Sequence, residues 1–417
     1  MQINIKFKTS IEKIAFILMS LHALVGFVWT QMKVDLSLAN NIIAVIIVLL
    51  LILGLFRGKI IYIGVGSLIW LPFIIYTIIG YLINKQLVYS LYWLSCLLAL
   101  LLAYKMNDFS ETIIKLIYVI GIFFTVGVFF EFFFHGLYDR YIATLYKTAD
   151  RMILIGHSNY GFAGFTYQLD TTAIGVMFAL GIFLYFFRKK YDVAKNVIIC
   201  IIFLLAILLT GKRIFIAAAI VVPLIISFST EENGIKRSYK ILGVILIVAL
   251  GVYFILSNAQ ILYNSKLFHR IGSTIIEYQK GLDYSAGRNN FAKIAISLFK
   301  KSPIWGIGPG NFIIQSKLGT DAHNTYLQVL CEQGIIGGIF YVFALVSTLF
   351  FTIKKIRNCE DEHILSVSKI SLFIQLTYIL HGFTGNTNIN LYGYMMYYIS
   401  LSLMLSAQNQ NERDILK

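Results

Sequence analysis

The chain alternates long apolar runs with short polar segments, and most of the apolar runs are long enough to cross a membrane as a helix. About 20 apolar residues are needed to span a hydrocarbon core of ~30 Å. We predict a helix for each run from its length rather than from its periodicity. The predicted spans cover residues 11–31, 36–56, 60–83, 87–104, 112–137, 169–187, 196–211, 213–229, 239–257, 334–353, 366–383 and 390–407.

The composition agrees with a lipid environment. Of the 417 residues, 58% are hydrophobic and 13% charged, against roughly a quarter charged in soluble domains, and the mean hydropathy is +0.78. The runs are apolar on both parities, which excludes the alternating pattern of a β-barrel. We therefore predict an all-α polytopic integral membrane protein with about 12 transmembrane helices, folded as one membrane domain over residues 1–417. Residues 1–13 lead directly into the first span, so we expect no cleaved signal peptide.

The net charge of +15 comes from basic residues between the apolar runs. They form no single stripe with interleaved aromatic residues, so we expect no nucleic-acid binding. Cytoplasmic loops carry an excess of Lys and Arg, and a cytoplasmic N-terminus places nearly every short basic cluster inside. These clusters are Arg57 with Lys59, Lys105, Arg188 to Lys190, Lys236 with Arg237 and Lys240, Lys354 with Lys355 and Arg357, and the C-terminal tail. We predict that both termini are cytoplasmic.

This topology leaves two long segments on the outer side, a first outer loop at residues 138–168 and a large periplasmic loop at residues 258–333. Long irregular segments are uncommon in compact proteins and often carry binding or catalysis. We therefore expect the functional site there.

The large loop has internal order. Apolar residues recur at helical spacing after Ser285-Ala286-Gly287, which predicts an amphipathic helix that ends at Lys300-Lys301-Ser302-Pro303. Its apolar positions are Phe291, Ile294, Ala295, Leu298 and Phe299. Residues 305–310, Trp-Gly-Ile-Gly-Pro-Gly, fit no phosphate-binding pattern and predict a tight turn between two outer helices. We expect Asp321 to cap the second helix, residues 322–333, and Gly334 and Gly337 to open the tenth span.

Three basic residues have unusual positions on the outer side. Lys212 and Arg213 fill a junction of almost no length between two spans, and an ionisable group at the lipid boundary is a candidate for a functional role. A Lys-Arg pair can also act as a topological stop, but the charge rule opposes one on the outer face. Arg288 stands in the first turn of the amphipathic helix, where a cation is disfavoured unless an anion also binds. Two arginine forks can hold a diphosphate from two sides.

Among the histidines, His323 lies on the outer side after Asp321-Ala322. We place it in the first turn of the outer helix, where the helix N-terminus disfavours imidazolium and leaves a ring that can accept a proton. A lone histidine is more often structural, and we interpret His22, His157 and His381 in that way. The four cysteines, Cys96, Cys200, Cys331 and Cys359, are far apart and are expected to be free thiols.

Three stretches resemble the signature region of the O-antigen polymerase and ligase superfamily. They are Ser285-Ala286-Gly287-Arg288, Pro303-Ile304-Trp305-Gly306-Ile307-Gly308-Pro309-Gly310-Asn311-Phe312, and His323-Asn324 followed after nine residues by Gly334-Ile335-Ile336-Gly337. The His-Asn-x9-Gly-x-x-Gly spacing is the most specific of these features. The resemblance is clear over about residues 200–350 and includes Thr210-Gly211-Lys212-Arg213.

The resemblance implies a GT-C-like membrane glycosyltransferase of the bacterial inner membrane, whose active site faces the periplasm. It implies His323 as the catalytic residue and Arg213 and Arg288 as ligands of the substrate diphosphate. Lys212 stands where the family often has Ser, and it either touches the ligand or replaces a neighbour. No Asp-x-Asp motif lies in an outer loop, and we expect neither a metal nor a cofactor.

The expected donor is an undecaprenyl-diphosphate-linked oligosaccharide, and a chain-length regulator and a flippase are further expected partners besides the bilayer. We favour an O-antigen polymerase, whose acceptor is a second lipid-linked repeat. An O-antigen ligase, whose acceptor is the lipid A core, and a transporter of lipid-linked oligosaccharides are the alternatives. An outer group of Lys147, Arg151, Lys212, Arg213, Arg270 and Arg288 would attract an anionic headgroup. The outer aromatic residues Tyr160, Phe162, Tyr167, Tyr284 and Trp305 either anchor the protein at the interface or stack on sugars.

Overall fold

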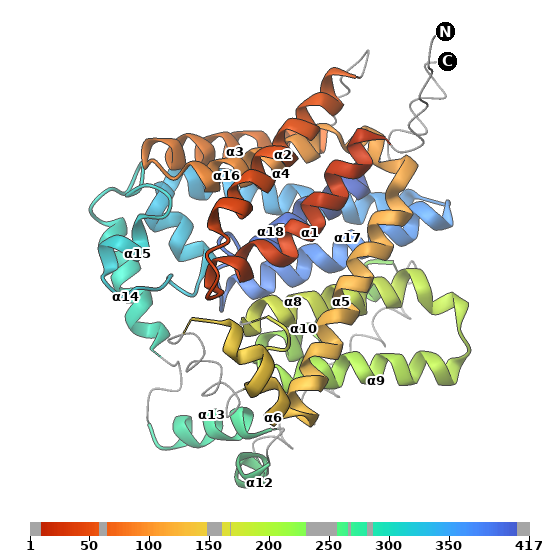
Figure 1. Ribbon diagram of the computed structural model, residues 1–417, viewed down its shortest axis with the longest axis vertical. Coiled ribbons are helices and arrows are strands. Elements are labelled where there is room, and N and C mark those ends of the chain that lie inside the picture. The colour runs from red at the N-terminus through yellow and green to blue at the C-terminus, as the bar shows by residue number, and fades with distance from the viewer. Residues whose placement is uncertain are drawn as a thin grey trace.

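The computed structural model describes residues 10–57, 65–147, 161–166, 168–230, 257–265, 268–281 and 287–406. Within these ranges the chain forms helices and no strand, and the long helices pack side by side as a bundle (Figure 1). The bundle consists of α1 (Ile11–Gln31), α2 (Ser37–Phe56), α3 (Val65–Ile83), α4 (Leu87–Leu101), α5 (Ser110–Phe133), α8 (Leu169–Ile182), α9 (Val193–Leu209), α10 (Arg213–Thr230), α16 (Thr325–Asn358), α17 (Glu362–Gly382) and α18 (Leu391–Ser406).

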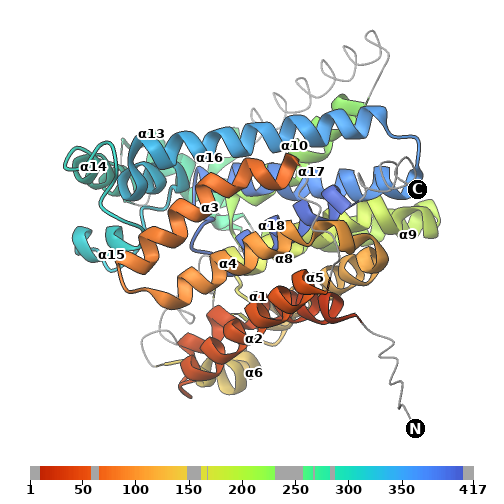
Figure 2. The ribbon, with the colours of Figure 1, turned by 90° about the horizontal axis from the view of Figure 1, so that it is seen from above.

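Short helical segments connect these elements. Within the bundle and the first outer loop they are η1 (Ala103–Phe109), α6 (His135–Leu137), η2 (Tyr138–Ile142), η3 (Ala143–Leu145), η4 (Phe183–Phe187) and η5 (Arg188–Lys190). The segment predicted as the large outer loop contains α12 (Ala259–Asn264), α13 (His269–Gln279), α14 (Arg288–Phe299) and α15 (Asn311–Ser316). Figure 2 shows α14 and α15 together at one end of the bundle, beside the ends of α3 and α16.

The bundle confirms a polytopic membrane protein. Among the described residues, six helical segments are long and apolar enough to cross a membrane, and the apolar helices at residues 87–101, 193–209 and 213–229 are shorter. The ninth predicted span, residues 239–257, lies almost wholly outside the described residues. The number of twelve spans therefore stays a prediction, as does the GT-C-like arrangement.

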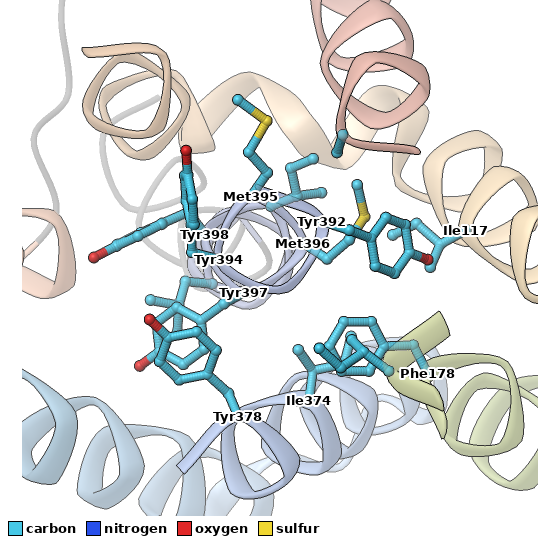
Figure 3. Packing of buried hydrophobic residues seen from close by; sticks show 14 of the residues in the cluster. Ile117, Phe178, Ile374, Tyr378, Tyr392, Tyr394, Met395, Met396, Tyr397 and Tyr398 are labelled. Carbon is cyan, nitrogen blue, oxygen red and sulfur yellow. The ribbon is translucent and has the colours of Figure 1, made fainter. Parts of the chain in front are cut away.

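The centre of the bundle is α18, in which every residue is buried. A helix that is apolar on all sides belongs in a core, and α18 lies between helices on several sides in Figure 3. Tyr394 stacks on Trp93 of α4 with ring centroids 5.1 Å apart, and Tyr397 packs on Tyr378 of α17 at 4.4 Å. The four cysteines are free thiols.

The connecting segments contact one another in two separate groups, one at each end of the bundle, and this grouping agrees with the predicted topology. At one end, Lys105 donates a hydrogen bond to the Glu12 carboxylate and another, 2.8 Å long, to the Gly54 carbonyl. Lys189 forms an ion pair with Glu362 at the same predicted side. Lys105, Lys189 and Glu362 belong to segments predicted to be cytoplasmic, and Glu12 and Gly54 lie at the predicted cytoplasmic ends of the first two spans. These contacts therefore join parts of the chain that the prediction places on one side.

The segments predicted to be outside also contact one another. The Asn84 side chain donates to the Pro309 carbonyl at 2.8 Å, which joins the α3–α4 turn to the large outer loop. The Thr325 N–H donates to the Gly385 carbonyl at 3.1 Å, which joins that loop to the α17–α18 connection. Which end faces the cytoplasm stays a prediction.

The helix α16 breaks at Gly334, where φ is 66° and ψ is −167°. The segment of residues 303–308 inserts at this break: Ile335 N–H donates to Pro303 O at 2.9 Å, and Gly308 N–H donates to Glu332 O at 2.7 Å. The predicted tight turn is thus present and docks on α16. A Cβ at Gly334 would lie 2.2 Å from Ile304 O, so only glycine allows this approach.

The prediction that Asp321 caps the helix entering the membrane is wrong. The helix begins at Thr325, and the cap is Asn324, whose side chain accepts a hydrogen bond from Leu327 N–H at 3.0 Å. His323 therefore precedes the helix instead of lying in its first turn. Its φ of 49° is left-handed and incompatible with a helical turn.

We expect Gly334→Ala to destabilise the protein far more than Gly281→Ala. Both glycines have a φ of 66°, but a Cβ at Gly281 would meet no described atom within 4 Å, while one at Gly334 would meet the Ile304 carbonyl. Gly281→Ala should cost about 1–2 kcal/mol from backbone strain alone. Gly334→Ala should cost at least about 3 kcal/mol, because the inserted segment must also move. Thermal unfolding in detergent measures both, and equal midpoints would contradict this role of the break.

Candidate active site

A sharp turn between α9 and α10 carries Lys212 and Arg213, the first two predicted site residues. The chain leaves α9 at Thr210 and turns at Gly211, whose φ is 66°. Lys212 follows, and Arg213 is the first residue of α10. Gly161 packs so closely on this turn that a Cβ there would lie 2.1 Å from Thr210 O. The predicted junction of almost no length is therefore present and tightly held.

The third predicted cation reaches the same place from the large outer loop. Arg288 is the first residue of α14, which starts after Gly287 with a φ of 81°. Lys212, Arg213 and Arg288 line one cleft of about 570 Å³, together with Thr274 of α13. The Arg213 guanidinium donates a hydrogen bond to the Thr274 hydroxyl. Arg213 and Arg288, which are 75 positions apart in the sequence, thus line the same cleft.

The charge balance of this cleft favours an anion. Its lining holds three cationic side chains and one carboxylate, that of Asp170, which leaves two net positive charges. Asp170 Oδ2 lies 2.8 Å from Lys212 Nζ, so this ion pair neutralises Lys212 and leaves the charge excess on the arginines. Guanidinium groups bind phosphate oxygens through paired N–H donors.

His323 lies in a second cavity, of about 360 Å³, and Asp170 lines both cavities. The loop that follows α15 forms one wall through Thr320, Asp321 and His323, and the start of α8 forms another. The four residues predicted from the sequence therefore occupy two adjoining cavities with one carboxylate between them.

The His323 ring is held by its neighbours in the loop. Asp321 Oδ1 accepts a hydrogen bond from His323 N–H at 2.6 Å and lies 3.3 Å from His323 Nδ1. Thr320 Oγ1 lies 3.5 Å from Nε2, and the ring packs on Phe291 of α14 at 5.3 Å. A proton on Nδ1 faces the carboxylate, which leaves Nε2 to accept a proton. The ring is 37% exposed, so a substrate hydroxyl can reach it.

The backbone behind His323 is fixed by the α17–α18 connection. Thr325 Oγ1 lies 3.0 Å from Thr387 Oγ1 and also accepts the Thr387 N–H at 2.9 Å. The Asn324 amide donates to the Phe383 carbonyl at 3.3 Å. The start of α16 is therefore held on both sides, and His323 takes its position from it.

Sequence reasoning did not single out Asp170 and interpreted His381 as structural, yet both residues line the second cavity. The His381 ring is 2% exposed and lines the second cavity, and its Nε2 lies 3.5 Å from Asp170 Oδ1. His381 therefore lies within the candidate site. An acid at the outer end of a span was the available signal for Asp170. His22, by contrast, is buried away from both cavities and contacts Asn40 Oδ1 at 2.7 Å, as a structural histidine would.

The outer aromatic residues separate into different cases. Phe162 is buried and packs edge-on against Phe132 with ring centroids 5.3 Å apart. Its ring is therefore not accessible to a sugar, and the prediction that it stacks on one is wrong. Trp305 is exposed but lines neither cavity. Tyr89 of α4, which the sequence did not single out, lines the second cavity. Tyr160, Tyr167, Tyr284, Arg151 and His157 lie outside the described residues, as does the side chain of Arg270.

Within the described part of the chain, no group of three or more His, Cys, Asp or Glu side chains is arranged to hold a metal ion. The acids that line the two cavities, Asp170 and Asp321, instead contact Lys212 and His323. The two cavities are lined by cationic side chains, by two imidazoles, those of His323 and His381, and by two carboxylates.

Apolar helices that carry a cationic cleft at one end define a polytopic membrane protein with a candidate site for an anion. Comparison with protein families gives the class more closely: residues 198–342 match the family model described as O-antigen ligase. This match confirms the predicted resemblance to the O-antigen polymerase and ligase superfamily over these residues. Lys212, Arg213, Arg288 and His323 all fall within the matched residues, whereas Asp170 and His381 do not. No curated protein matches the sequence.

Proposed function

We propose that the protein is an O-antigen polymerase, or a polymerase of a related surface polysaccharide. It transfers a glycan from undecaprenyl diphosphate to a hydroxyl of a second lipid-linked repeat unit. The observation that carries this proposal is the pair of adjoining cavities, one cationic and one holding His323. The family match at residues 198–342 supports the reaction class.

In this proposal the donor diphosphate lies in the cationic cleft between Arg213 and Arg288. Charge develops on the diphosphate as it leaves, and preorganised donors stabilise that charge most where water is excluded. Lys212 keeps N–H donors for the phosphate beside the one that faces Asp170, because an ammonium group has three. The arginines neutralise the leaving group, so the reaction needs no metal and no nucleotide.

His323 is the proposed general base. Its Nε2 takes the proton of the acceptor hydroxyl while the oxygen attacks the anomeric carbon. The bond from that carbon to the diphosphate oxygen breaks on the opposite face, so the configuration inverts. Asp321 stabilises the imidazolium that forms. The bacterial inner membrane, with the site facing the periplasm and the termini in the cytoplasm, is the proposed location.

A ligase would use the same donor site and differ in its acceptor. Deletion of the gene, followed by electrophoresis of the surface glycan, separates the two. We expect a single repeat on the lipid A core, because the ligase would still transfer unpolymerised units. Long chains retained on the lipid carrier would show that the protein is the ligase, and an unchanged ladder would contradict both functions.

We expect Arg288→Lys to lose much of the transfer activity although the charge is kept. A point ammonium does not reproduce a bidentate phosphate contact, and a charge-assisted hydrogen bond contributes about 1.5–3 kcal/mol, or roughly 10- to 150-fold in rate. Arg140→Lys is the matched control, because Arg140 is exposed beside Tyr141 and lines neither cavity. Transfer in detergent measures both variants. Full activity of both Arg288→Lys and Arg288→Ala would remove Arg288 from the site.

We expect His323→Ala to abolish glycan transfer and to leave membrane insertion and donor binding nearly intact. General-base catalysis contributes about 10²–10⁴-fold. The expected loss in His323→Ala is therefore of at least this size, with donor binding kept. His135→Ala is the control, since His135 is half-exposed and pairs with Asp139 away from both cavities. An activity loss below about tenfold would assign the base to another group.

A further inference from the structure

The second cavity carries polar side chains that the proposed chemistry does not use. Besides the His323 loop, its walls hold Gln168, Asp170, Asn386 and Asn390. They come from the start of α8 and from the α17–α18 connection, both outside the residues that match the family model. Amide and carboxylate side chains in a cavity of about 360 Å³ suit a small polar ligand rich in hydrogen-bonding groups.

These amides are held in place before any ligand arrives. The Asn390 amide donates to Thr171 Oγ1 at 3.0 Å, and the Thr171 hydroxyl donates to Gln168 Oε1 at 2.9 Å. Asn390 Oδ1 in turn accepts Gly393 N–H at 2.9 Å. Asn386 and Asn390 are both almost fully buried. A chain of hydrogen bonds that locks the side chains reduces the entropy lost when a ligand binds.

Asp170 is the unusual member of this set. Its charge would repel a diphosphate, yet it stands at the wall that the cationic cleft and the second cavity share. Lys212 occupies Oδ2 at 2.8 Å and His381 Nε2 lies 3.5 Å from Oδ1, while the side chain stays 31% exposed. An ionised carboxylate accepts about four hydrogen bonds and donates none. The remaining acceptor positions suit hydroxyl groups.

We propose that the second cavity is the subsite for the acceptor glycan, and that Asp170 is a specificity-determining residue that accepts a hydrogen bond from a sugar hydroxyl beside the one that reacts. This inference rests on the proposed transferase function. The Tyr89 ring, which stacks on Tyr81 at 5.4 Å and is 43% exposed, presents an apolar face at the same cavity. Because Asp170 also borders the cationic cleft, it places the acceptor next to the donor diphosphate.

Two soluble probes separate the cavities in the full-length protein purified in detergent. One is the lipid-free repeat-unit oligosaccharide, released by mild acid from the lipid-linked glycan of the source bacterium. The other is farnesyl diphosphate, which carries the diphosphate and no sugar. Saturation-transfer NMR measures oligosaccharide binding, and displacement of a fluorescent polyprenyl diphosphate analogue measures the second probe.

We expect Asp170→Asn to weaken oligosaccharide binding about 5- to 10-fold, because a neutral hydrogen bond replaces a charge-assisted one. Binding of farnesyl diphosphate should become tighter in the same variant, since a negative charge leaves the cleft wall. Gln168→Ala should weaken binding of the oligosaccharide about 2- to 10-fold and leave binding of farnesyl diphosphate unchanged. Arg288→Lys should have the opposite effect: it should weaken binding of farnesyl diphosphate and leave binding of the oligosaccharide unchanged.

Three results would overturn the inference. The first is a wild-type protein that binds farnesyl diphosphate and not the oligosaccharide. The second is unchanged oligosaccharide binding in both Asp170→Asn and Gln168→Ala. The third is an equal loss for both probes in Asp170→Asn, which would show that Asp170 supports the fold alone. A failure of the proposed function would give a different result, because the wild-type protein would then bind both probes and transfer no glycan.

Discussion

A helix that breaks inside a membrane bundle leaves backbone groups without helical partners, and lipid offers no water to satisfy them. At Gly334 the outer loop supplies the missing partners, because residues 303–308 bond to both sides of the break. The buried Glu332 carboxylate extends this junction by accepting the Phe312 N–H at 3.0 Å. The loop is thereby fixed to α16 at the break. Arg288 precedes this junction in the chain and His323 follows it.

The sequence predicted the local features of the fold well, because each depends on neighbouring residues. Apolar length located the helices, and the helical spacing from Phe291 to Phe299 located α14, which packs on α16 through Ala295 and Leu298. Gly334 was expected to open the tenth span, whereas in the structure it marks a break within the longer helix α16. The cap was assigned to Asp321 and not to Asn324 because both residues favour that position and their sequence context does not separate them.

The site was only partly predictable, for a different physical reason. Lys212 and Arg213 were visible because a charge at a span boundary is unusual in any fold. Arg288 was visible because a cation is disfavoured in the first turn of a helix. Asp170 is recognised as a candidate site residue by its contacts with Lys212 and His381, which lie 42 and 211 positions further along the chain. Only the tertiary structure brings the three residues together. The polar lining of the second cavity likewise comes from ordinary Asn and Gln side chains, which carry no sequence signal.

The burial of α18 on all sides bears on how the protein is assembled. Residues 391–406 follow in the chain every helix that they contact, among them α1, α4, α8 and α17. Helices emerge from the ribosome in order, so the surrounding ones reach the bilayer while their central position is still vacant. Until α18 arrives, Trp93 and Tyr378 lack the ring contacts that they later make with Tyr394 and Tyr397. Closure of the bundle is therefore a late step of assembly, and truncation within α18 should leave the core incomplete.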